Sequence, residues 1–461
     1  MRRRVQRVHF VGIGGVGMSG IAEILHVQGY SVSGSDVRES AATRRMRELG
    51  IRIGIGHDAS LVEGADVVVF SSAVPATNPE LKAAELACVP VIPRAEMLAE
   101  LMRMKYGVAI GGSAGKTTTT SMTAEVLAAG GLDPTTVVGG RVISLGANSR
   151  LGEGEVLVAE ADESDGSFLR LVPTVVVITN IDRDHLDHYG SFEKLHAAFV
   201  EFANRVPFYG CAVLNIDDPH VQTLLPQVTR RAWTYGFSPQ ADVAAERVEA
   251  HGLGMRFGVR AHGQPLGNFA LRVPGRHNVS NALAAITVGL EFDVPVEVIA
   301  RALAEFRGVE RRFEIVGERG GITVIDDYSH HPAKVRAALA AAREGLKRRI
   351  VVAYQPHRYT RTRDVFDELA RAFHDADVLV LTEIYAAGEP KLPGVSGAVL
   401  AEAVRACGHR AVEFVPEKAA IVPRLRELVR PGDLLFFMGA GDIGRLAREF
   451  LASEDGGSPE H

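Results

Sequence analysis

The sequence has few cysteines, one tryptophan and no long apolar run. Cys88, Cys211 and Cys407 are the only cysteines among 461 residues, and their spacing matches no metal-ligand pattern. Three scattered thiols are typical of a protein from a reducing compartment, so we expect a cytoplasmic location. No segment is long and apolar enough to span a bilayer, and we therefore expect no membrane insertion.

The chain also lacks an excess of charge of either sign. It carries 51 basic and 56 acidic side chains, for a formal net charge of -5. Without a basic field, nucleic acid is not a favoured partner. Apolar residues make up 46% of the chain and charged residues 23%, as in ordinary globular proteins. The length exceeds what one core supports, which predicts two or three domains.

The most informative stretch is Gly111–Thr120, between the apolar run 106–110 and a helical pattern over 121–129. A strand, a glycine loop and a helix that begins in hydroxyl residues together form an anion site, because unpaired N–H groups and the helix dipole favour phosphate. Lys116 is positioned to reach the terminal phosphates, and Thr117 offers a hydroxyl to Mg²⁺. The loop is not a strict Walker A motif, because Ile110 stands where its first glycine belongs. A turn that only joins strand to helix is the alternative.

A second glycine loop, Gly12-Ile-Gly14-Gly-Val-Gly17, follows the apolar run 7–11 and precedes a helical pattern. The next strand ends at Asp36, at the spacing of the dinucleotide-binding fingerprint. By itself this pattern predicts NAD or FAD, with Asp36 on a ribose. Another pyrophosphate nucleotide fits equally, because a helix N-terminus recognises phosphate and not nicotinamide. A glycine turn for close packing is the remaining alternative.

Two carboxylate-rich segments follow predicted strands near the phosphate loop. Residues 160–165 follow the run 156–159, and residues 179–187 follow the run 174–178. Parallel strand ends next to a phosphate loop suit Mg²⁺, and Glu160 and His185 are the candidates we select. Solvated loop acids and helix caps are the alternative for the other members. A dinuclear hydrolase site is a rival interpretation, which the phosphate loop makes less favourable.

The last third of the chain again places polar or glycine-rich segments after each predicted strand. These segments are 326–332, 355–363, 383–389 and 439–444. Ligand-binding loops of open α/β sheets lie at this edge. Arg358 suits a carboxylate or phosphate, since a guanidinium binds either in bidentate fashion. Upstream, Asn278 and Asn281 are one helical turn apart and can face one ligand, unless one is merely a helix cap.

Several of these motifs together resemble the Mur ligase family of ATP-dependent, amide-bond-forming enzymes of peptidoglycan synthesis. They are Gly-Lys-Thr-Thr-Thr-Thr, Glu160-Ala-Asp-Glu-Ser-Asp, Thr-Asn-Ile-x-x-Asp-His-Leu-Asp and Pro-Gly-x-His-Asn-x-x-Asn. The motifs Gly-x-Gly-Gly-x-Gly-Met-Ser-Gly, Asp-Asp-Tyr-x-His-His-Pro, Gln-Pro-His-Arg-Tyr-Thr-Arg-Thr-Arg and Met-Gly-Ala-Gly-Asp-Ile-Gly are similar to the branch that joins L-alanine to UDP-N-acetylmuramate. The resemblance covers nearly the whole chain.

The resemblance implies an α/β fold of three domains. A Rossmann-like UDP-sugar domain is expected over 1–105, a P-loop ATPase-like central domain over 106–313, and a Rossmann-like C-terminal domain over 314–461. The first glycine loop would then hold the diphosphate of a UDP-sugar, with no hydride chemistry.

The resemblance also implies roles for individual residues. Residues expected at the UDP-sugar are Gly12, Gly14, Gly15, Gly17, Met18, Ser19, Asp36, Ser71 and Ser72. Residues expected at ATP are Gly112, Ser113, Ala114, Gly115, Lys116, Thr117, Thr118, His277, Asn278, Asn281 and Asp326. Tyr328, His330, His357 and Arg358 would line the amino-acid pocket. Thr117, Glu160 and His185 would bind metal, and Lys116, Glu160, His185 and Arg312 would be catalytic.

The implied reaction transfers a phosphoryl group from ATP to the lactyl carboxylate of UDP-N-acetylmuramate. The amine of L-alanine then attacks the acyl phosphate, and phosphate leaves. ATP and Mg²⁺ are the expected cofactors, and the expected state is a monomer or homodimer. The phosphate loop departs from the family pattern, which is Gly-Thr-x-Gly-Lys with histidine at x in this branch; here Ala114 takes that place. We expect ATP binding to survive this change, with altered turnover.

Three alternatives stay open from the sequence. A sister ligase attaches a recycled tripeptide to the same UDP-sugar, although the segment 355–363 favours alanine. An NAD-dependent oxidoreductase explains only the first domain and leaves Lys116 unused. A P-loop ATPase that binds a partner explains only the central domain.

Overall fold

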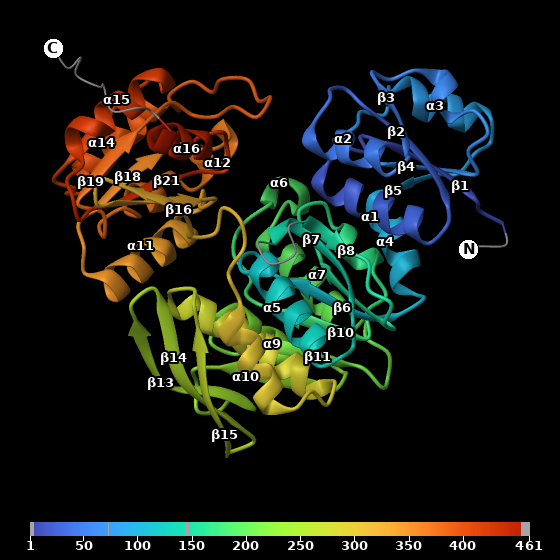
Figure 1. Ribbon diagram of the computed structural model, residues 1–461, viewed down its shortest axis with the longest axis horizontal. Coiled ribbons are helices and arrows are strands. Elements are labelled where there is room, and N and C mark those ends of the chain that lie inside the picture. The colour runs from blue at the N-terminus through green and yellow to red at the C-terminus, as the bar shows by residue number, and fades with distance from the viewer. Residues whose placement is uncertain (1–3, 72, 143–146, 453–461) are drawn as a thin grey trace, which may run out of the picture. The chain divides into compact units, whose positions relative to one another are not determined.

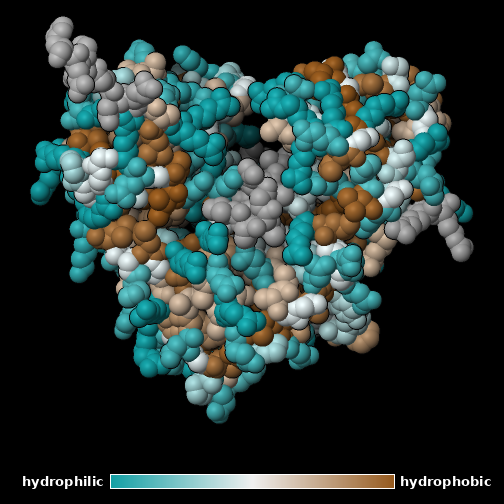
Figure 2. Space-filling model, viewed as in Figure 1, coloured by the Kyte–Doolittle hydropathy of each residue, from teal (hydrophilic) through white to brown (hydrophobic). Residues whose placement is uncertain are grey.

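The computed structural model describes residues 4–71, 73–142 and 147–452, so the predicted ligand residue Ser72 lies outside the described residues. Three sheets with helices against them make up the chain (Figure 1). This is the α/β fold with two Rossmann-like parts and a central P-loop part that the sequence predicts. No helix in the described ranges combines the length and the hydropathy needed to cross a membrane. On the face drawn in Figure 2, apolar residues form separate groups among hydrophilic ones.

The first sheet is parallel throughout and has the strand order β3-β2-β1-β4-β5. Its strands are β1 (Arg7–Val11), β2 (Ser31–Asp36), β3 (Arg52–Ile55), β4 (Val67–Phe70) and β5 (Val91–Pro93). Its helices are α1 (Val16–Val27), α2 (Ala41–Glu48), α3 (Pro79–Leu86) and α4 (Arg94–Met102), with the 3-10 turn η1 (Ala59–Val62). Local sequence sets the helix starts, because Asn78 caps α3 and Pro79 occupies its first turn.

The central sheet has ten strands, in the order β15-β14-β13-β12-β11-β10-β6-β9-β7-β8. They are β6 (Tyr106–Gly111), β7 (Thr135–Val142), β8 (Ala147–Arg150), β9 (Val156–Glu160), β10 (Val175–Ile178), β11 (Cys211–Asn215), β12 (Ala232–Gly236), β13 (Val243–His251), β14 (Gly254–Ala261) and β15 (Gln264–Leu271). The helical segments are α5 (Lys116–Ala129), η2 (Ser167–Arg170), α6 (Leu186–Tyr189), α7 (Phe192–Ala203), α8 (Pro219–Leu224), η3 (Leu225–Gln227), α9 (Arg276–Glu291) and α10 (Val296–Glu305). The strands β9, β6 and β10 are parallel neighbours, which brings their carboxyl ends to one edge.

An aromatic cluster fixes the phosphate-loop end of β6. Phe168 lies 5.3 Å from Phe199 and 4.7 Å from Phe202 between ring centroids, and all three rings are fully buried. A side chain at Gly111 would come within 2.9 Å of the Phe202 ring. Glycine at this position therefore lets the helix α7 pack directly on the end of β6.

The third sheet has the order β16-β17-β21-β18-β19-β20, with only β16 antiparallel to its neighbour. Its strands are β16 (Glu314–Arg319), β17 (Ile322–Asp327), β18 (Ile350–Tyr354), β19 (Val378–Leu381), β20 (Val412–Phe414) and β21 (Leu434–Met438). Its helices are α11 (Pro332–Leu346), α12 (Tyr359–Asp364), α13 (Phe366–Ala370), α14 (Gly397–Ala406), α15 (Lys418–Leu428) and α16 (Gly444–Ala452). Every residue of β21 is buried, because separate apolar clusters cover the two faces of the sheet.

The three sheets fall within the three predicted domain ranges. Compactness divides the chain differently, into two units. The first holds Met1–Arg247, Phe257–Phe269 and Ser280–Phe306, and the second holds Val248–Arg256, Ala270–Val279 and Arg307–His461. The domain bounds at 105 and 313 therefore stay a prediction.

Candidate active site

The phosphate loop joins β6 to α5 in the first unit, as predicted. Gly112 and Gly115 have φ values of +132° and +84°, which favour glycine, and Gly115 is the N-cap of α5. A Cβ at Gly112 would lie 2.1 Å from Thr179 Oγ1, and one at Gly115 would lie 2.6 Å from Asn281 Oδ1. Both glycines are therefore required by backbone angle and by close packing.

The segment after β10 holds this loop by its backbone. The Ala114 N–H donates to Asn180 Oδ1 at 2.8 Å, and the Ala114 carbonyl accepts from Thr179 Oγ1 at 2.6 Å and from Asn180 Nδ2 at 2.9 Å. Ser113 Oγ in turn accepts from the Asp182 N–H at 2.8 Å. The shape of the loop thus does not depend on the side chain at position 114. The sequence did not identify Thr179 and Asn180 as loop-holding residues.

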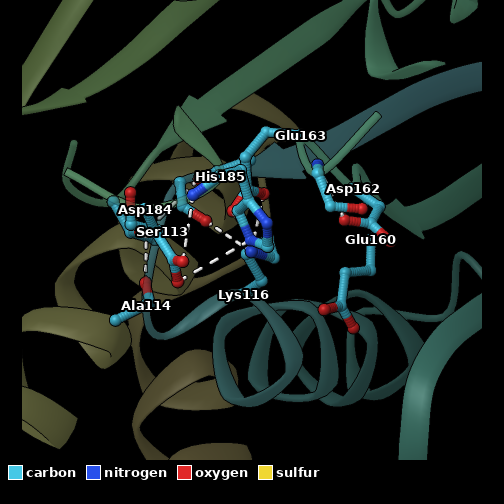
Figure 3. A network of polar contacts seen from close by, with 12 residues as sticks. Ser113, Ala114, Lys116, Glu160, Asp162, Glu163, Asp184 and His185 are labelled. Atoms are coloured by element: carbon cyan, nitrogen blue, oxygen red, sulfur yellow. Dashed lines mark hydrogen bonds and ion pairs between the residues drawn. The ribbon is translucent and has the colours of Figure 1, made fainter. Parts of the chain in front are cut away.

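Lys116 is enclosed by the loop and by one buried carboxylate (Figure 3). Its Nζ donates to the Gly112 carbonyl at 2.6 Å and to Glu163 Oε2 at 2.7 Å. The Glu163 side chain is only 1% exposed. Burial acts against the charge of Lys116, but the carboxylates of Glu163, Glu160 and Asp162 outweigh it and raise the pKa of Lys116. The lysine is therefore a fixed cation in the phosphate cradle.

Glu163 was not among the predicted site residues, yet it links two of them. Its Oε1 lies 3.7 Å from His185 Nε2, while its Oε2 binds Lys116. His185 has a φ of +57° and is the N-cap of the short helix α6, and its Nε2 also lies 3.7 Å from Asp184 Oδ2. The His185 ring thus lies near the carboxylates of both Glu163 and Asp184.

Thr117 and Glu160, both predicted metal ligands, lie together. Thr117 Oγ1 donates to Glu160 Oε2 at 3.0 Å, where β9 ends beside β6. Figure 3 shows Glu160 apart from the group formed by Lys116, Glu163 and His185. Within the described ranges no group of three or more His, Cys, Asp or Glu side chains is arranged to bind a metal ion. A hydroxyl and one carboxylate nevertheless fit Mg²⁺, which takes its other oxygens from phosphate and water.

The structure brings Asn281 to the phosphate loop but gives Asn278 a different contact. Thr119 Oγ1 donates to Asn281 Oδ1 at 3.2 Å. Asn278 Nδ2 donates to the Pro274 carbonyl at 2.7 Å, and Asn278 belongs to the second compact unit. Thr118 lies half-buried in the first turn of α5. The two amides on α9 therefore make different local contacts.

The glycine loop of the first sheet has the predicted strand-to-helix geometry. The Gly14 N–H donates to Asp36 Oδ2 at 2.9 Å, so Asp36 is turned back onto the loop. Gly12 has a φ of +79°, and a Cβ added there would lie 3.4 Å from the Cβ of Ser71, which follows β4.

The start of α1 is closely packed and already hydrogen-bonded. A Cβ at Gly17 would lie 2.6 Å from Arg94. Met18 and Ser19 are buried, and their N–H groups donate to the Gly15 carbonyl at 3.0 and 2.9 Å. Any ligand contact by the backbone N–H groups of these two residues has to compete with that bonding.

In the second unit, Asp326 at the end of β17 pairs with Arg311 and not with Arg312. Arg311 Nε donates to Asp326 Oδ2 at 3.2 Å, and Arg311 also donates to the Gly439 carbonyl at 2.8 Å. Burial raises the pKa of Asp326 to about 6, against the attraction of Arg311. Arg312 lies over the Tyr328 ring, 4.9 Å from its centroid. The sequence missed Arg311, which stands next to the residue it selected.

The predicted amino-acid residues form a cluster of rings at the ends of β17, β18 and β19. The His330 ring lies 5.3 Å from Tyr328 and 5.9 Å from His357, and His357 stacks on Tyr385 at 5.6 Å. Arg358 follows with a φ of +67°, and its N–H donates to the Tyr385 carbonyl at 2.8 Å. Tyr385 follows a different strand, and sequence reasoning did not select it.

Both histidines of this cluster are uncharged at neutral pH. Burial, together with nearby cations, holds the pKa of His330 well below its ordinary value. Burial, with Arg361 and Arg358, lowers the pKa of His357 to about 4. His277, on α9, is likewise buried, and burial lowers its pKa against the attraction of Asp327. The cluster therefore offers neutral rings beside guanidinium groups, which suits a carboxylate-bearing ligand.

Replacing Gly115 by alanine tests how tightly the loop is packed. The substitution places a Cβ 2.6 Å from Asn281 Oδ1 and strains a left-handed residue by about 1–2 kcal/mol, so we expect ATP affinity to fall at least about 10-fold. Calorimetric titration with ATP measures this. Gly131→Ala is the matched control, because its φ is +81° and no described atom lies within 4 Å of the new Cβ. Equal ATP affinity in both variants would show that the Asn281 contact does not constrain the loop.

Comparison with known proteins agrees with this geometry. The model of the Mur ligase family catalytic domain matches residues 7–106, the Mur ligase middle domain matches 110–289, and the Mur ligase glutamate ligase domain matches 311–441. The chain is similar to the UDP-N-acetylmuramate--L-alanine ligase of Sorangium cellulosum, with 58% identity over 99% of this chain and 98% of the relative. The ligase of the same name from Myxococcus xanthus is 55% identical over 97% and 95% of the two chains.

Solved structures agree at the level of the whole chain. The UDP-N-acetylmuramate-alanine ligase of Thermotoga maritima superposes with a TM-score of 0.81 at 32% identity, over 96% of this chain and 98% of that one. A murein peptide ligase from Psychrobacter arcticus has the same fold, with a TM-score of 0.70 at 22% identity over 97% and 98% of the two chains. With three matching domain models and relatives of this identity along its whole length, the chain belongs to the Mur ligase family.

Proposed function

We propose that this chain joins L-alanine to the lactyl carboxylate of UDP-N-acetylmuramate at the expense of ATP, in peptidoglycan precursor synthesis. The observation that carries the proposal is the enclosed cation Lys116 in a glycine cradle at the carboxyl edge of the central sheet. The names of the full-length relatives from Sorangium cellulosum and Myxococcus xanthus support the choice of substrates. A cytoplasmic location and a monomeric or homodimeric state are part of the proposal.

The proposed first step is attack of the lactyl carboxylate on the terminal phosphorus of ATP, which forms the acyl phosphate and releases ADP as the leaving group. Both reactants are anions, so their approach requires positive charge in a site of low dielectric. Lys116, the N–H groups of the glycine loop and the amino end of α5 supply it. When bound, Mg²⁺ would be held by Thr117 and Glu160, with His185 as a further candidate, and would neutralise phosphate charge.

The second step is attack of the L-alanine amine on the acyl phosphate, after which phosphate leaves and the amide forms. The ring cluster of Tyr328, His330 and His357 is proposed to hold the amino acid, with Arg358 on its carboxylate. Neutral rings are suitable there, because protonated histidines would repel the ammonium form of the amino acid before it loses its proton. Arg312 is proposed to stabilise the negative charge that develops during the reaction.

The remaining predicted contacts complete the proposal. Proposed nucleotide contacts are the loop residues Gly112 to Thr118, together with His277, Asn278, Asn281 and Asp326. Proposed UDP-sugar contacts are the described residues of the first glycine loop and strand ends: Gly12, Gly14, Gly15, Gly17, Met18, Ser19, Asp36 and Ser71. We also propose a UDP-sugar-binding domain over 1–105, an ATP-binding domain over 106–313 and a C-terminal domain that contacts the amino acid and ATP over 314–461.

Product mass spectrometry tests the proposal directly. Full-length protein with ATP, Mg²⁺, UDP-N-acetylmuramate and L-alanine should yield the amide and one ADP for each amide. Amide formed only when a tripeptide replaces L-alanine would favour the sister ligase instead. ATP hydrolysis that is independent of the UDP-sugar would favour a P-loop ATPase. ATP binding without amide formation would point to Ala114, and Ala114→His should then restore turnover.

A further inference from the structure

A buried polar cluster in the first sheet, far along the chain from the phosphate loop, has no part in the reaction described above. His9 on β1 and Glu80 on α3 are 1% and 0% exposed, and His9 Nε2 lies 2.6 Å from Glu80 Oε2. His9 Nδ1 lies 2.9 Å from Ser33 Oγ on β2. Burying a carboxylate and an imidazole costs free energy unless every polar atom has a hydrogen-bond partner. Both nitrogens of the His9 ring have such a partner.

The second oxygen of Glu80 holds a third group, His57. Glu80 Oε1 lies 2.7 Å from His57 Nδ1, which is also 3.1 Å from Ser35 Oγ. Hydrogen bonds from His9, Ser35 and His57 hold the pKa of Glu80 below its ordinary value, although burial acts in the opposite direction. Asn78 Oδ1 accepts from the Glu80 N–H at 2.9 Å and so fixes the start of α3. Glu80 is thus a rigid, ionised acceptor.

The ionised state of Glu80 determines what His57 can offer to a ligand. A carboxylate only accepts hydrogen bonds, so His57 Nδ1 must carry the proton. In the neutral ring the lone pair is then on Nε2, which becomes an acceptor. Both hydrogen bonds of the ring to described residues are made by Nδ1, and the His57 side chain is 18% exposed whereas Glu80 is hidden. The cluster therefore presents one acceptor atom of fixed orientation.

The position of His57 places this acceptor at the ligand edge of the sheet. His57 follows β3, whose last residue, Ile55, pairs with Asp36 at the end of β2. The Gly56 N–H donates to the Asp36 carbonyl at 2.8 Å, and Asp36 Oδ2 accepts from Gly14 of the glycine loop. A ligand at the carboxyl ends of these strands therefore lies beside the ring.

The simpler alternative is that the cluster is a structural staple, which only ties the strands and the helix together and binds no ligand. His9, Ser33 and Glu80 Oε2 tie β1, β2 and α3 together, and His57 Nδ1 satisfies the other oxygen of the buried carboxylate. Such a staple needs only Nδ1 of the His57 ring, whereas the side chain, 18% exposed, also carries the acceptor Nε2, oriented as precisely placed polar groups in ligand sites are. This difference favours a binding role for His57.

We propose that His57 accepts a hydrogen bond at Nε2 from the nucleoside part of the UDP-sugar, and that Glu80 and His9 are positioning residues for its ring. The inference rests on the proposed UDP-sugar function of this sheet. The donor on the ligand is an N–H of the pyrimidine or an O–H of the ribose, the two kinds of donor that a uridine nucleotide carries.

Calorimetric titration of the full chain with UDP tests the proposal. His57→Phe and His57→Asn should weaken UDP binding about 3- to 10-fold, the usual effect of one hydrogen bond, while His57→Gln, whose amide oxygen reaches the Nε2 position, should keep most of the affinity. KM for ATP and for L-alanine should not change. The exposed His251→Asn is the control. Unchanged UDP affinity in His57→Phe, with or without a fall in Tm, would overturn the proposal and leave a structural staple.

Ligand analogues identify the donor and test the positioning residues. With 2′-deoxy-UDP, 3′-deoxy-UDP and N3-methyl-UDP, one analogue should bind the native chain more weakly and lose that difference in His57→Phe; no such coupling with any analogue contradicts the proposal. Glu80→Gln should raise KM for the UDP-sugar and leave kcat unchanged. A fall in kcat with no change in the KM for the UDP-sugar would indicate a structural role only. Failure of the native chain to bind UDP would instead refute the proposed function itself.

Discussion

Replacing Lys116 by methionine is expected to lower the rate of amide formation by about 10³-fold, because it removes the cation that is enclosed by the phosphate loop and Glu163. Methionine keeps the length and the apolar stem of the side chain, so the loop itself should persist. Steady-state kinetics with all three substrates at saturation measure the effect. Lys194→Met is the matched control, because Lys194 is exposed on α7, and its kcat should equal that of the native chain.

Stability has to be separated from catalysis in this variant. Lys116→Met leaves the Glu163 carboxylate buried without its cation, and an unpaired buried charge costs about 3–5 kcal/mol. The double variant Lys116→Met with Glu163→Gln removes that charge, so it should recover Tm but not turnover. If the double variant regained near-native turnover, the catalytic role of Lys116 would be wrong and its effect only structural.

Glu160→Gln is the second change with a large expected effect, and its signature is the requirement for Mg²⁺. Glutamine can still accept the hydrogen bond from Thr117 Oγ1, but it loses the negative charge that a hard cation prefers. We expect kcat to fall about 100-fold, with the Mg²⁺ concentration for half-maximal activity shifted upward. Activity measured over a Mg²⁺ titration at constant ATP shows both quantities.

Glu163, three residues after Glu160, provides a comparison for the effect on the Mg²⁺ requirement. Glu163→Gln removes the charge of the carboxylate that pairs with Lys116, and Figure 3 shows Glu160 apart from this pair. It should therefore change the KM for ATP without moving the Mg²⁺ requirement. If Glu160→Gln and Glu163→Gln shift the Mg²⁺ titration equally, or if neither does, then Thr117 and Glu160 do not form the metal site.

The local patterns that the sequence predicted correctly depend on neighbouring residues along the chain. Glycines at 112 and 115 followed by Lys116 predict a loop that needs positive φ angles, and both angles are found. The apolar run 156–159 predicts a strand that delivers Glu160 near the phosphate loop, and in the structure β9 pairs with β6 and Glu160 accepts a hydrogen bond from Thr117. Hydrophobic periodicity and the residue preferences of turns involve only a few neighbouring residues. A single sequence is therefore enough to detect them.

Sequence reasoning missed residues whose contacts depend on the direction of a side chain and on partners far away in the chain. Whether Asp162 or Glu163 faces Lys116 depends on the turn after β9. Arg311, which has a φ of +58°, pairs with Asp326, and no nearby sequence pattern indicates that it does so in place of Arg312.

The sequence by itself determined the fold class, the family and the phosphate loop, because these follow from local periodicity and motif. Only the tertiary structure decided which side chains share a site, as with Tyr385 and His357, or with Glu80 between His9 and His57. Such pairs are joined when strands from distant parts of the chain pack side by side, and the register of that packing is a property of the whole sheet.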